Sequence, residues 1–323
     1  MSGLSDSFQR PIDYLRISVT DRCNMRCVYC MPAEGVPLLA HSDILSYEEI
    51  TAIVRIAVQL GISKVRLSGG EPLLRSGITG LVRSLAAIDG LVDLSLTTNG
   101  TLLAGMAHDL KEAGLRRVNV SLDSLRQETF HSMTRLGDLA SVLRGIAAAK
   151  DAGLTPVKTN TVVIRGVNDN EILDFARKTI DDGWNVRFIE LMPFALMSAD
   201  RVVSTLEIRQ RLETLGRLEP AQSIGGNGPA RYFRFVGATG SVGFISPVTE
   251  HFCFGCNRLR LTADGGLRPC LLINKQIDLR EAIRGKDEQK VKQLIQEAVA
   301  SKPRQHQLLQ GNQPESSMSH IGG

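Results

Sequence analysis

The chain lacks the features of a membrane protein and of a nucleic-acid-binding protein. It contains no run of about 18 uncharged apolar residues, the length that spans a bilayer. Its first dozen residues, MSGLSDSFQRPI, contain no apolar stretch of the kind found in signal peptides. Aromatic residues make up only 5% of the chain and basic runs are short, so stacking platforms and charged stripes are not evident. We therefore expect a cytoplasmic protein that binds neither membranes nor nucleic acids.

The composition is that of an ordinary globular protein with a sizeable core. Hydrophobic residues make up 43% of the 323 residues, and charged residues make up 22%. A chain of this length exceeds the usual size of a single core, so we expect one large domain with an extension, or two domains. The formal net charge of +4 permits a polyanionic ligand but does not require one.

A strand pattern followed by a helix pattern occurs six times before about residue 216. Ser46 and Glu49 predict a capping box at the start of the first helix, and Gly61 predicts its end. This alternation favours parallel strands joined by right-handed crossovers, in a doubly wound sheet or in a complete or partial (βα) barrel. The strand-like segments, rich in Val, Ile, Leu and Thr, are residues 14–20, 64–69, 91–99, 116–123, 156–164 and 185–193.

The pattern changes after about residue 216. A glycine-rich loop at 224–231 precedes short segments that predict antiparallel strands, the last pair turning at 264–266, and helical patterns follow. We therefore expect a core domain at residues 1–228 and a C-terminal α+β extension at residues 229–323.

Polar residues follow each of the six predicted core strands. Loops are often polar for other reasons, but in a (βα) barrel the functional groups gather at this end of the strands. The residues concerned are Thr20, Asp21, SGGEP at 68–72, TTNG at 97–100, Ser121, Asp123, Lys158, Asn160, Glu190 and Met192.

Three of the six cysteines, Cys23, Cys27 and Cys30, form a C-x3-C-x2-C pattern just after the first predicted strand. Zinc would need a fourth ligand, and the nearest histidine, His41, lies eleven residues beyond Cys30. Disulfides are uncommon in the cytoplasm. A four-iron, four-sulfur cluster with one iron free of protein ligands explains the odd number of thiols.

This pattern, with Tyr29 directly before the third cysteine, resembles the signature of the radical S-adenosylmethionine (SAM) superfamily. The segment SGGEP at 68–72 is similar to the second SAM-binding element of that superfamily. The resemblance implies an α/β fold, a partial (βα)6 barrel of the TIM type, with a 4Fe-4S cluster on the cysteines and SAM as a cofactor.

The other three cysteines, Cys253, Cys256 and Cys270, form a C-x2-C-x13-C pattern on the predicted extension. A zinc site completed by His251 is the alternative that these residues leave open. The likeness of the first triplet to an iron–sulfur protein favours a second 4Fe-4S cluster that also has an open iron.

Three further features resemble the MoaA family of GTP 3′,8-cyclases: CNRLRL at 256–261, the arginine of YLRISVTDRCN, and the terminal Gly-Gly. The likeness extends from about Tyr14 to Gly323. In that family, cleavage of SAM gives a 5′-deoxyadenosyl radical that abstracts the 3′ hydrogen of GTP. The C3′ radical then adds to guanine C8, giving 3′,8-cyclo-7,8-dihydroguanosine triphosphate, the first step of molybdenum cofactor biosynthesis. The resemblance thus implies a lyase with GTP between two clusters.

The resemblance also assigns individual residues. An independent argument supports the assignment of Arg16 and Arg66 to an anionic ligand. Both lie in apolar strand segments, where an unpaired buried charge costs at least several kcal/mol. Arg258 and Arg260 are two apart and would share a face of a strand. The implied GTP contacts are Arg16, Arg66, Thr97, Lys158, Arg258, Leu259 and Arg260. The implied SAM contacts are Tyr29, Gly70, Ser121 and Met192.

The implied partners are GTP, a reducing electron donor such as flavodoxin or ferredoxin, and the cyclic pyranopterin monophosphate synthase that follows in the pathway. The chain would act as a monomer or a homodimer. Two alternatives remain: another radical SAM enzyme with an auxiliary cluster, such as a peptide-modifying one, and a zinc-stabilised basic module that binds nucleic acid. Iron and sulfide analysis separates the second alternative from the radical SAM enzymes.

The resemblance gives the terminal Gly322 and Gly323 a catalytic role, because the tail is thought to reach into the active site and glycine can thread beside a ligand. We predict that removing both residues leaves the two clusters bound but abolishes cyclisation of GTP. Iron content and product formation are measured on the same sample. Unchanged turnover in the truncated chain would contradict the role.

Overall fold

Six parallel strands form the centre of the sheet, as the sequence predicts. The computed structural model describes residues 3–193, 197–306, 308 and 318–321. Each central strand lies inside its predicted range and pairs in parallel with the next one along the chain. They are β1 (Tyr14–Ser18), β2 (Lys64–Ser68), β3 (Asp93–Thr98), β4 (Arg117–Ser121), β5 (Lys158–Val163) and β6 (Asn185–Glu190).

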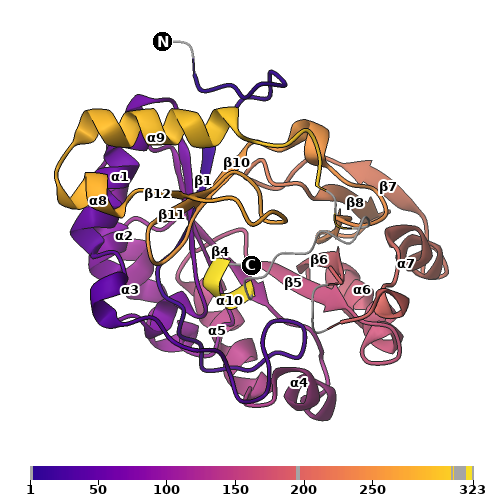
Figure 1. Ribbon diagram of the computed structural model, residues 1–323. Coiled ribbons are helices and arrows are strands. Elements are labelled where there is room, and N and C mark those ends of the chain that lie inside the picture. Colours follow the sequence, from indigo (N-terminus) through magenta and orange to yellow (C-terminus); the bar gives the residue numbers. More distant parts are fainter. Residues whose placement is uncertain (1–2, 194–196, 307, 309–317, 322–323) are drawn as a thin grey trace.

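Helices cover the outer face of these strands, and the sheet curls into a partial barrel (Figure 1). Ser46 caps the first helix: the Glu49 N–H donates to Ser46 Oγ at 3.1 Å, and the Ser46 N–H donates to Glu49 Oε2 at 2.7 Å. The predicted capping box is therefore confirmed. The helices are α1 (Tyr47–Gln59), α2 (Ile78–Ala86), α3 (Ala107–Glu112), α4 (Gln127–Thr134), α5 (Leu139–Asp151), α6 (Ile172–Asp181) and α7 (Thr205–Leu212).

The extension adds strands to both edges of the core instead of forming a sheet of its own. β9 pairs in parallel with β6, and β10 pairs in parallel with β1, so all strands belong to one sheet. The predicted antiparallel pairs, β8 with β9 and β10 with β11, are confirmed. β7 (Leu218–Ala221) lies before residue 228 but pairs antiparallel with β8. The strands after residue 228 are β8 (Arg231–Phe235), β9 (Ser241–Ile245), β10 (Arg258–Leu261), β11 (Gly266–Arg268) and β12 (Ile277–Asp278).

The parallel pairing of β9 with β6 and of β10 with β1 has a physical reason. A sheet that does not close leaves a row of unpaired backbone groups at each edge, here along β1 and β6. β10 and β9 satisfy those groups. The domain boundary at residue 228 stays a prediction. The strands that follow it pair with opposite edges of the core, β9 with β6 and β10 with β1.

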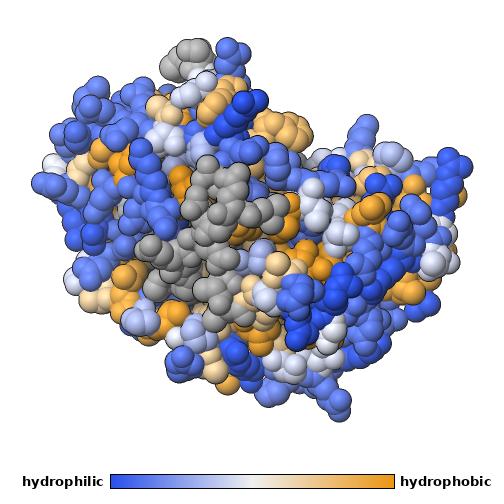
Figure 2. Space-filling view, turned by 45° about the vertical axis from the view of Figure 1, so that its right-hand side comes forward, coloured by the Kyte–Doolittle hydropathy of each residue, from blue (hydrophilic) through white to orange (hydrophobic). Residues whose placement is uncertain are grey.

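The C-terminal segment returns across the molecule. α8 (Arg280–Arg284) and α9 (Glu288–Ala300) pack against α1, and α10 (Met318–Ile321) lies over the opening of the barrel (Figure 1). The exterior in Figure 2 is mostly hydrophilic, with apolar residues in scattered patches. Within the described ranges, none of the helices has the length and apolar composition needed to cross a bilayer.

The strands place apolar residues outward and leave their inner face for polar groups. Leu15, Ile17, Val65 and Leu67 are buried in the core between strands and helices. Side chains alternate along a strand, so the intervening arginines of β1 and β2 point into the barrel. The candidate site lies on this inner face.

Candidate functional site

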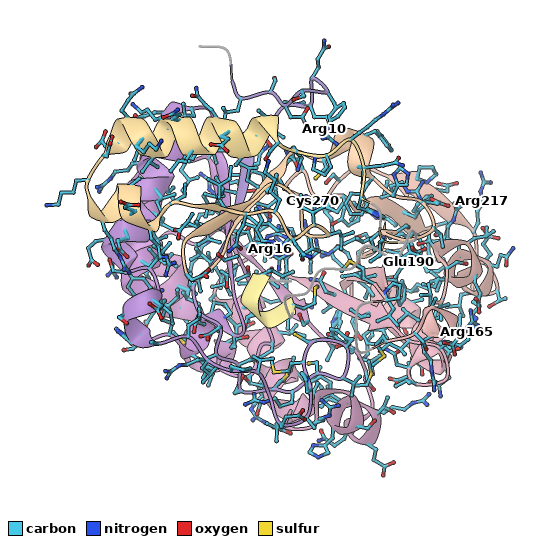
Figure 3. The ribbon with its side chains drawn as sticks, in the orientation of Figure 1. Arg10, Arg16, Arg165, Glu190, Arg217 and Cys270 are labelled. Carbon is cyan, nitrogen blue, oxygen red and sulfur yellow. The ribbon has the colours of Figure 1, made fainter. Side chains whose placement is uncertain are left out.

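A cavity of about 210 Å³ lies inside the barrel. Its walls come from all six central strands, from β10, from the loops of the extension and from Met318 of α10. Figure 3 shows Arg16 and Cys270 inside the ring of strands, and Arg165 and Arg217 at its outer rim. The predicted site residues that line the cavity are Arg16, Tyr29, Arg66, Thr97, Ser121, Met192, Arg258 and Arg260.

Three arginines stand side by side on neighbouring strands. The strand register pairs Arg16 with Arg260 on one side and with Arg66 on the other. Arg16 Nε donates to Ser68 Oγ at 3.2 Å, and Arg66 Nε donates to Ser95 Oγ at 3.1 Å. Burial, reinforced by the charges of Arg260 and Arg66, lowers the pKa of Arg16 well below its ordinary value. Such a row is electrostatically unfavourable until an anion meets it.

Arg187 on β6 adds a fourth arginine that the sequence analysis missed. Its Nη2 donates to Asn119 Oδ1 at 2.6 Å, and its buried Nε has no hydrogen-bond partner among the described residues. Burial is the main cause that lowers its pKa to about 10. Arg187 interrupts an apolar strand just as Arg16 and Arg66 do, so the same sequence signal was available.

Two predicted GTP contacts do not line the cavity. Lys158 is buried, and its Nζ donates to the carbonyl oxygen of Gly225 at 2.6 Å. Burial, together with the charges of Arg187, Arg117 and Arg66, lowers the pKa of Lys158 to about 6. Leu259 is buried in the hydrophobic core, so only its backbone is available to a ligand.

The first cysteine triplet lies in the loop after β1. All three thiols are free of disulfides. Burial raises the pKa of Cys27 well above its ordinary value, and the nearby Asp123, Cys30 and Cys23 raise it further. The three thiols are therefore close enough to affect one another's ionisation.

Tyr29 joins this loop to the end of β4. Its hydroxyl donates to Asp123 Oδ2 at 2.7 Å, and the N–H of Val162 donates to Asp123 Oδ1 at 2.8 Å. Burial raises the pKa of Asp123 to about 6 and raises that of Tyr29 well above its ordinary value. The sequence marked Asp123 only as a polar strand end, because its link to Tyr29 spans 94 positions.

The SGGEP segment after β2 packs against the same loop. Gly70 does not line the cavity; its N–H donates to the carbonyl oxygen of Thr20 at 2.8 Å. Glu71, which the sequence analysis did not single out, accepts hydrogen bonds from Thr98 Oγ1 at 2.7 Å and from the Asn99 N–H at 2.6 Å. Burial raises the pKa of Glu71 to about 7.

The second triplet lines a smaller cavity of about 70 Å³. This cavity shares Met192, Arg258 and Arg260 with the larger one, so the two are adjacent. Burial opposes ionisation of Cys256, but the charges of Arg258 and Lys302 and hydrogen bonds from Arg258 outweigh it and lower its pKa to about 6. The three cysteines that meet here are Cys253, Cys256 and Cys270.

The donor sets suit iron–sulfur clusters better than single metal ions. In the described part of the chain, no three His, Cys, Asp or Glu side chains are arranged to hold one metal ion. In a cluster each thiolate binds its own iron, so the sulfur atoms need not converge on one point. His251, the zinc alternative, is exposed, and its ring packs against that of His306 at 5.8 Å. Gly322 and Gly323 lie outside the described residues.

The barrel and its cysteine loop define a radical SAM protein. A family model described as "Radical SAM superfamily" matches residues 17–179, and one described as "Molybdenum Cofactor Synthesis C" matches residues 184–308. The chain is 52% identical to the GTP 3′,8-cyclase of Moorella thermoacetica over 323 residues, covering 99% of this chain and 100% of that protein. It is also 52% identical to that of Pelotomaculum thermopropionicum over 325 residues, with the same coverage. The chain therefore belongs to the GTP 3′,8-cyclase family of the radical SAM superfamily, and is a lyase of molybdenum cofactor biosynthesis.

Solved structures show the same fold. Streptococcus suis SuiB bound to precursor peptide SuiA superposes with a TM-score of 0.62 at 13% identity, covering 82% of this chain and 61% of SuiB. SuiB bound to S-adenosylmethionine gives a TM-score of 0.59 at 14% identity, covering 84% of this chain and 64% of SuiB. This chain thus spans less than two thirds of SuiB, and the likeness concerns the fold alone.

We predict that Gly70→Ala displaces the loop of the first triplet. A Cβ at residue 70 would lie 2.3 Å from the carbonyl oxygen of Arg22, and backbone atoms cannot yield as a flexible side chain can. The expected cost is about 1–3 kcal/mol of unfolding free energy, with loss of iron from the first cluster.

Gly80→Ala is the matched control, because nothing lies within 4 Å of a Cβ added at that helical position. It should leave iron content unchanged. Denaturant unfolding and iron analysis measure both effects, and normal iron loading in Gly70→Ala would contradict the packing argument.

Proposed function

We propose that this chain converts GTP into 3′,8-cyclo-7,8-dihydroguanosine triphosphate with two 4Fe-4S clusters and SAM. The first cluster would be held by Cys23, Cys27 and Cys30, and the second by Cys253, Cys256 and Cys270. The observation that carries the proposal is a pair of adjacent cavities that share Arg258 and Arg260: the larger is lined by Tyr29 of the first triplet's loop, and the smaller is lined by the second triplet.

When bound, the first cluster and SAM supply a 5′-deoxyadenosyl radical that abstracts the 3′ hydrogen of GTP. The protein's own contribution is to hold the reacting groups in place. Arginine forks match phosphate oxygens in pairs, so the row of Arg260, Arg16 and Arg66 suits the triphosphate. A triphosphate fixed there keeps the nucleoside within the same cavity, where orientation lowers the barrier to attack on guanine C8.

The SAM contacts that the resemblance implies belong to the proposal as well. Tyr29, Ser121 and Met192 line the larger cavity, and Tyr29 belongs to the loop of the first triplet. Gly70 would act through its backbone, because its packing against Arg22 leaves no space for a side chain. Thr97 and Arg258 complete the wall on the GTP side.

The tail belongs to the proposal as well. Met318 of α10 lines the cavity, and Ile321 at the end of this helix is buried. Gly322 and Gly323 follow directly and are proposed to complete the site. A low-potential donor such as flavodoxin or ferredoxin would supply electrons, and cyclic pyranopterin monophosphate synthase would take the product.

Anaerobic reconstitution tests the function directly. We expect about eight irons per chain and, with GTP, SAM and dithionite, formation of the cyclised nucleotide together with 5′-deoxyadenosine. Zinc without sulfide, or 5′-deoxyadenosine without a nucleotide product, would contradict the proposal.

Lys158 gives a pH-dependent prediction. With a pKa of about 6 its amine is mostly neutral at pH 7.5 in the free protein, and a triphosphate would raise that pKa. Lys158 does not line the cavity, but Arg187 and Arg66, whose charges lower its pKa, do. Neutralisation of these arginines by GTP should therefore cause uptake of part of a proton, and Lys158→Met should reduce this uptake. The unfolded chain binds this proton below about pH 10.4, the ordinary lysine pKa, whereas the folded protein binds it only below about pH 6. The free energy of unfolding therefore falls as pH drops from about 10.4 towards 6. Because Lys158→Met removes this loss, it should also raise Tm at pH 7.5.

Calorimetry of GTP binding in buffers of different ionisation enthalpy measures the proton uptake. Lys111→Met is the matched control, because Lys111 Nζ also donates to a glycine carbonyl at 2.6 Å but is exposed. Equal uptake in wild type and Lys158→Met would rule out the lysine as the proton acceptor.

A further inference from the structure

Lys302 carries a buried charge beside the second cysteine triplet. It follows α9 and is 4% exposed. Its Nζ donates to the carbonyl oxygen of Arg258 at 2.7 Å and to that of Pro269 at 2.6 Å. Arg258 lies two residues after Cys256, and Pro269 directly precedes Cys270. One ammonium group therefore ties together the two chain segments that bring these cysteines to the same cavity.

The charge of Lys302 has no carboxylate partner within ion-pair distance in the described part of the chain. Arg10 is a useful contrast, because it also bonds the triplet's backbone, at the carbonyl oxygen of Cys253, but is paired with the buried Asp6. An uncompensated buried ammonium costs several kcal/mol. The fold retains one at Lys302, so an anion should be present beside it.

The groups that can supply this anion are the thiols. Lys302 lines the small cavity with all three cysteines. A cluster on three thiolates would place a stable negative charge at this position, and that charge grows when the cluster gains an electron.

We propose that Lys302 is a positioning residue for the second iron–sulfur cluster and that its charge favours the reduced state of that cluster. The inference rests on the proposed function, which puts a cluster on this triplet. Charge and hydrogen bonding around the sulfur atoms set the reduction potential of such clusters. At the first triplet both signs of charge are present, because Arg26 Nη1 donates to the carbonyl oxygen of Cys23 at 2.8 Å and the carboxylate of Asp123 accepts a hydrogen bond from Tyr29 at 2.7 Å.

The test is an anaerobic redox titration of the reconstituted holoenzyme with dithionite, followed by electron paramagnetic resonance. The signal that changes on addition of SAM reports the first cluster, and the signal that changes on addition of GTP reports the second. Lys302→Gln removes the charge but keeps two hydrogen-bond donors. At a given potential it should lower the reduced-to-oxidised ratio of the second cluster at least tenfold, a shift of about 59 mV to more negative potential.

Two controls separate charge from structure. Lys302→Arg keeps the charge and should restore most of the wild-type potential, whereas Lys290→Met removes an exposed charge from α9 and should change nothing. If Lys302→Gln fails to bind the second cluster while Lys302→Arg binds it, the need for the charge is supported. A wild-type potential in Lys302→Gln with full iron content would overturn the inference alone. Wild-type protein with only four irons per chain would overturn the proposed function as well.

Discussion

The repulsion among neighbouring arginines, which are half-buried or buried, is the constraint on which the interior of this barrel depends. Arg260, Arg16 and Arg66 occupy the same level of three adjacent strands. Strands lie about 4.8 Å apart, and like charges about 5 Å apart repel by about 3 kcal/mol at an effective dielectric of 20. A fold keeps such a row only where a polyanion neutralises it. The apolar residues that stabilise the barrel therefore lie on its outer face, between strands and helices, and the inner face is left for the ligand.

The extension matters because it completes this interior. β10 joins the edge of β1, and that pairing places Arg260 next to Arg16. The same hairpin carries cysteines at both ends, with Cys256 before β10 and Cys270 after β11. A single edge pairing thus positions the arginines and the second triplet together. The distance between the two triplets is then set by the width of the barrel, not by a flexible linker.

The sequence predicted the parts of the structure that depend on local patterns. Periodicity located the six core strands, Ser46 and Glu49 located a helix start, and charge in an apolar strand located Arg16. The parallel joins of β9 and β10 were not predictable in this way, because pairing depends on which edges the folded core leaves open. Arg187 carried the same signal as Arg16 and was overlooked.

Other residues of the site could not be read from local patterns. Asp123 and Glu71 matter through hydrogen bonds to residues far along the chain or on another strand. Lys302 lies 32 residues after Cys270, in a segment with no motif of its own. Leu259 is different, because simple alternation between Arg258 and Arg260 already points its side chain to the opposite face of β10.

The two triplets share backbone and arginine contacts but differ in the balance of charge around them. At the first triplet, the N–H groups of Gly70 and Glu71 donate to the carbonyls of Thr20 and Arg22, each at 2.8 Å, and Arg26 Nη1 donates to the carbonyl oxygen of Cys23 at 2.8 Å. The carboxylates Glu71 and Asp123 oppose ionisation of Cys23 and Cys27, whereas Arg26 favours that of Cys23. At the second triplet, the charges of Arg258 and Lys302 favour ionisation of Cys256, and that of Arg10 favours ionisation of Cys253. Because positive surroundings stabilise an added electron, the mixed charges at the first triplet and the cations at the second separate the electronic properties of two centres that have the same ligands.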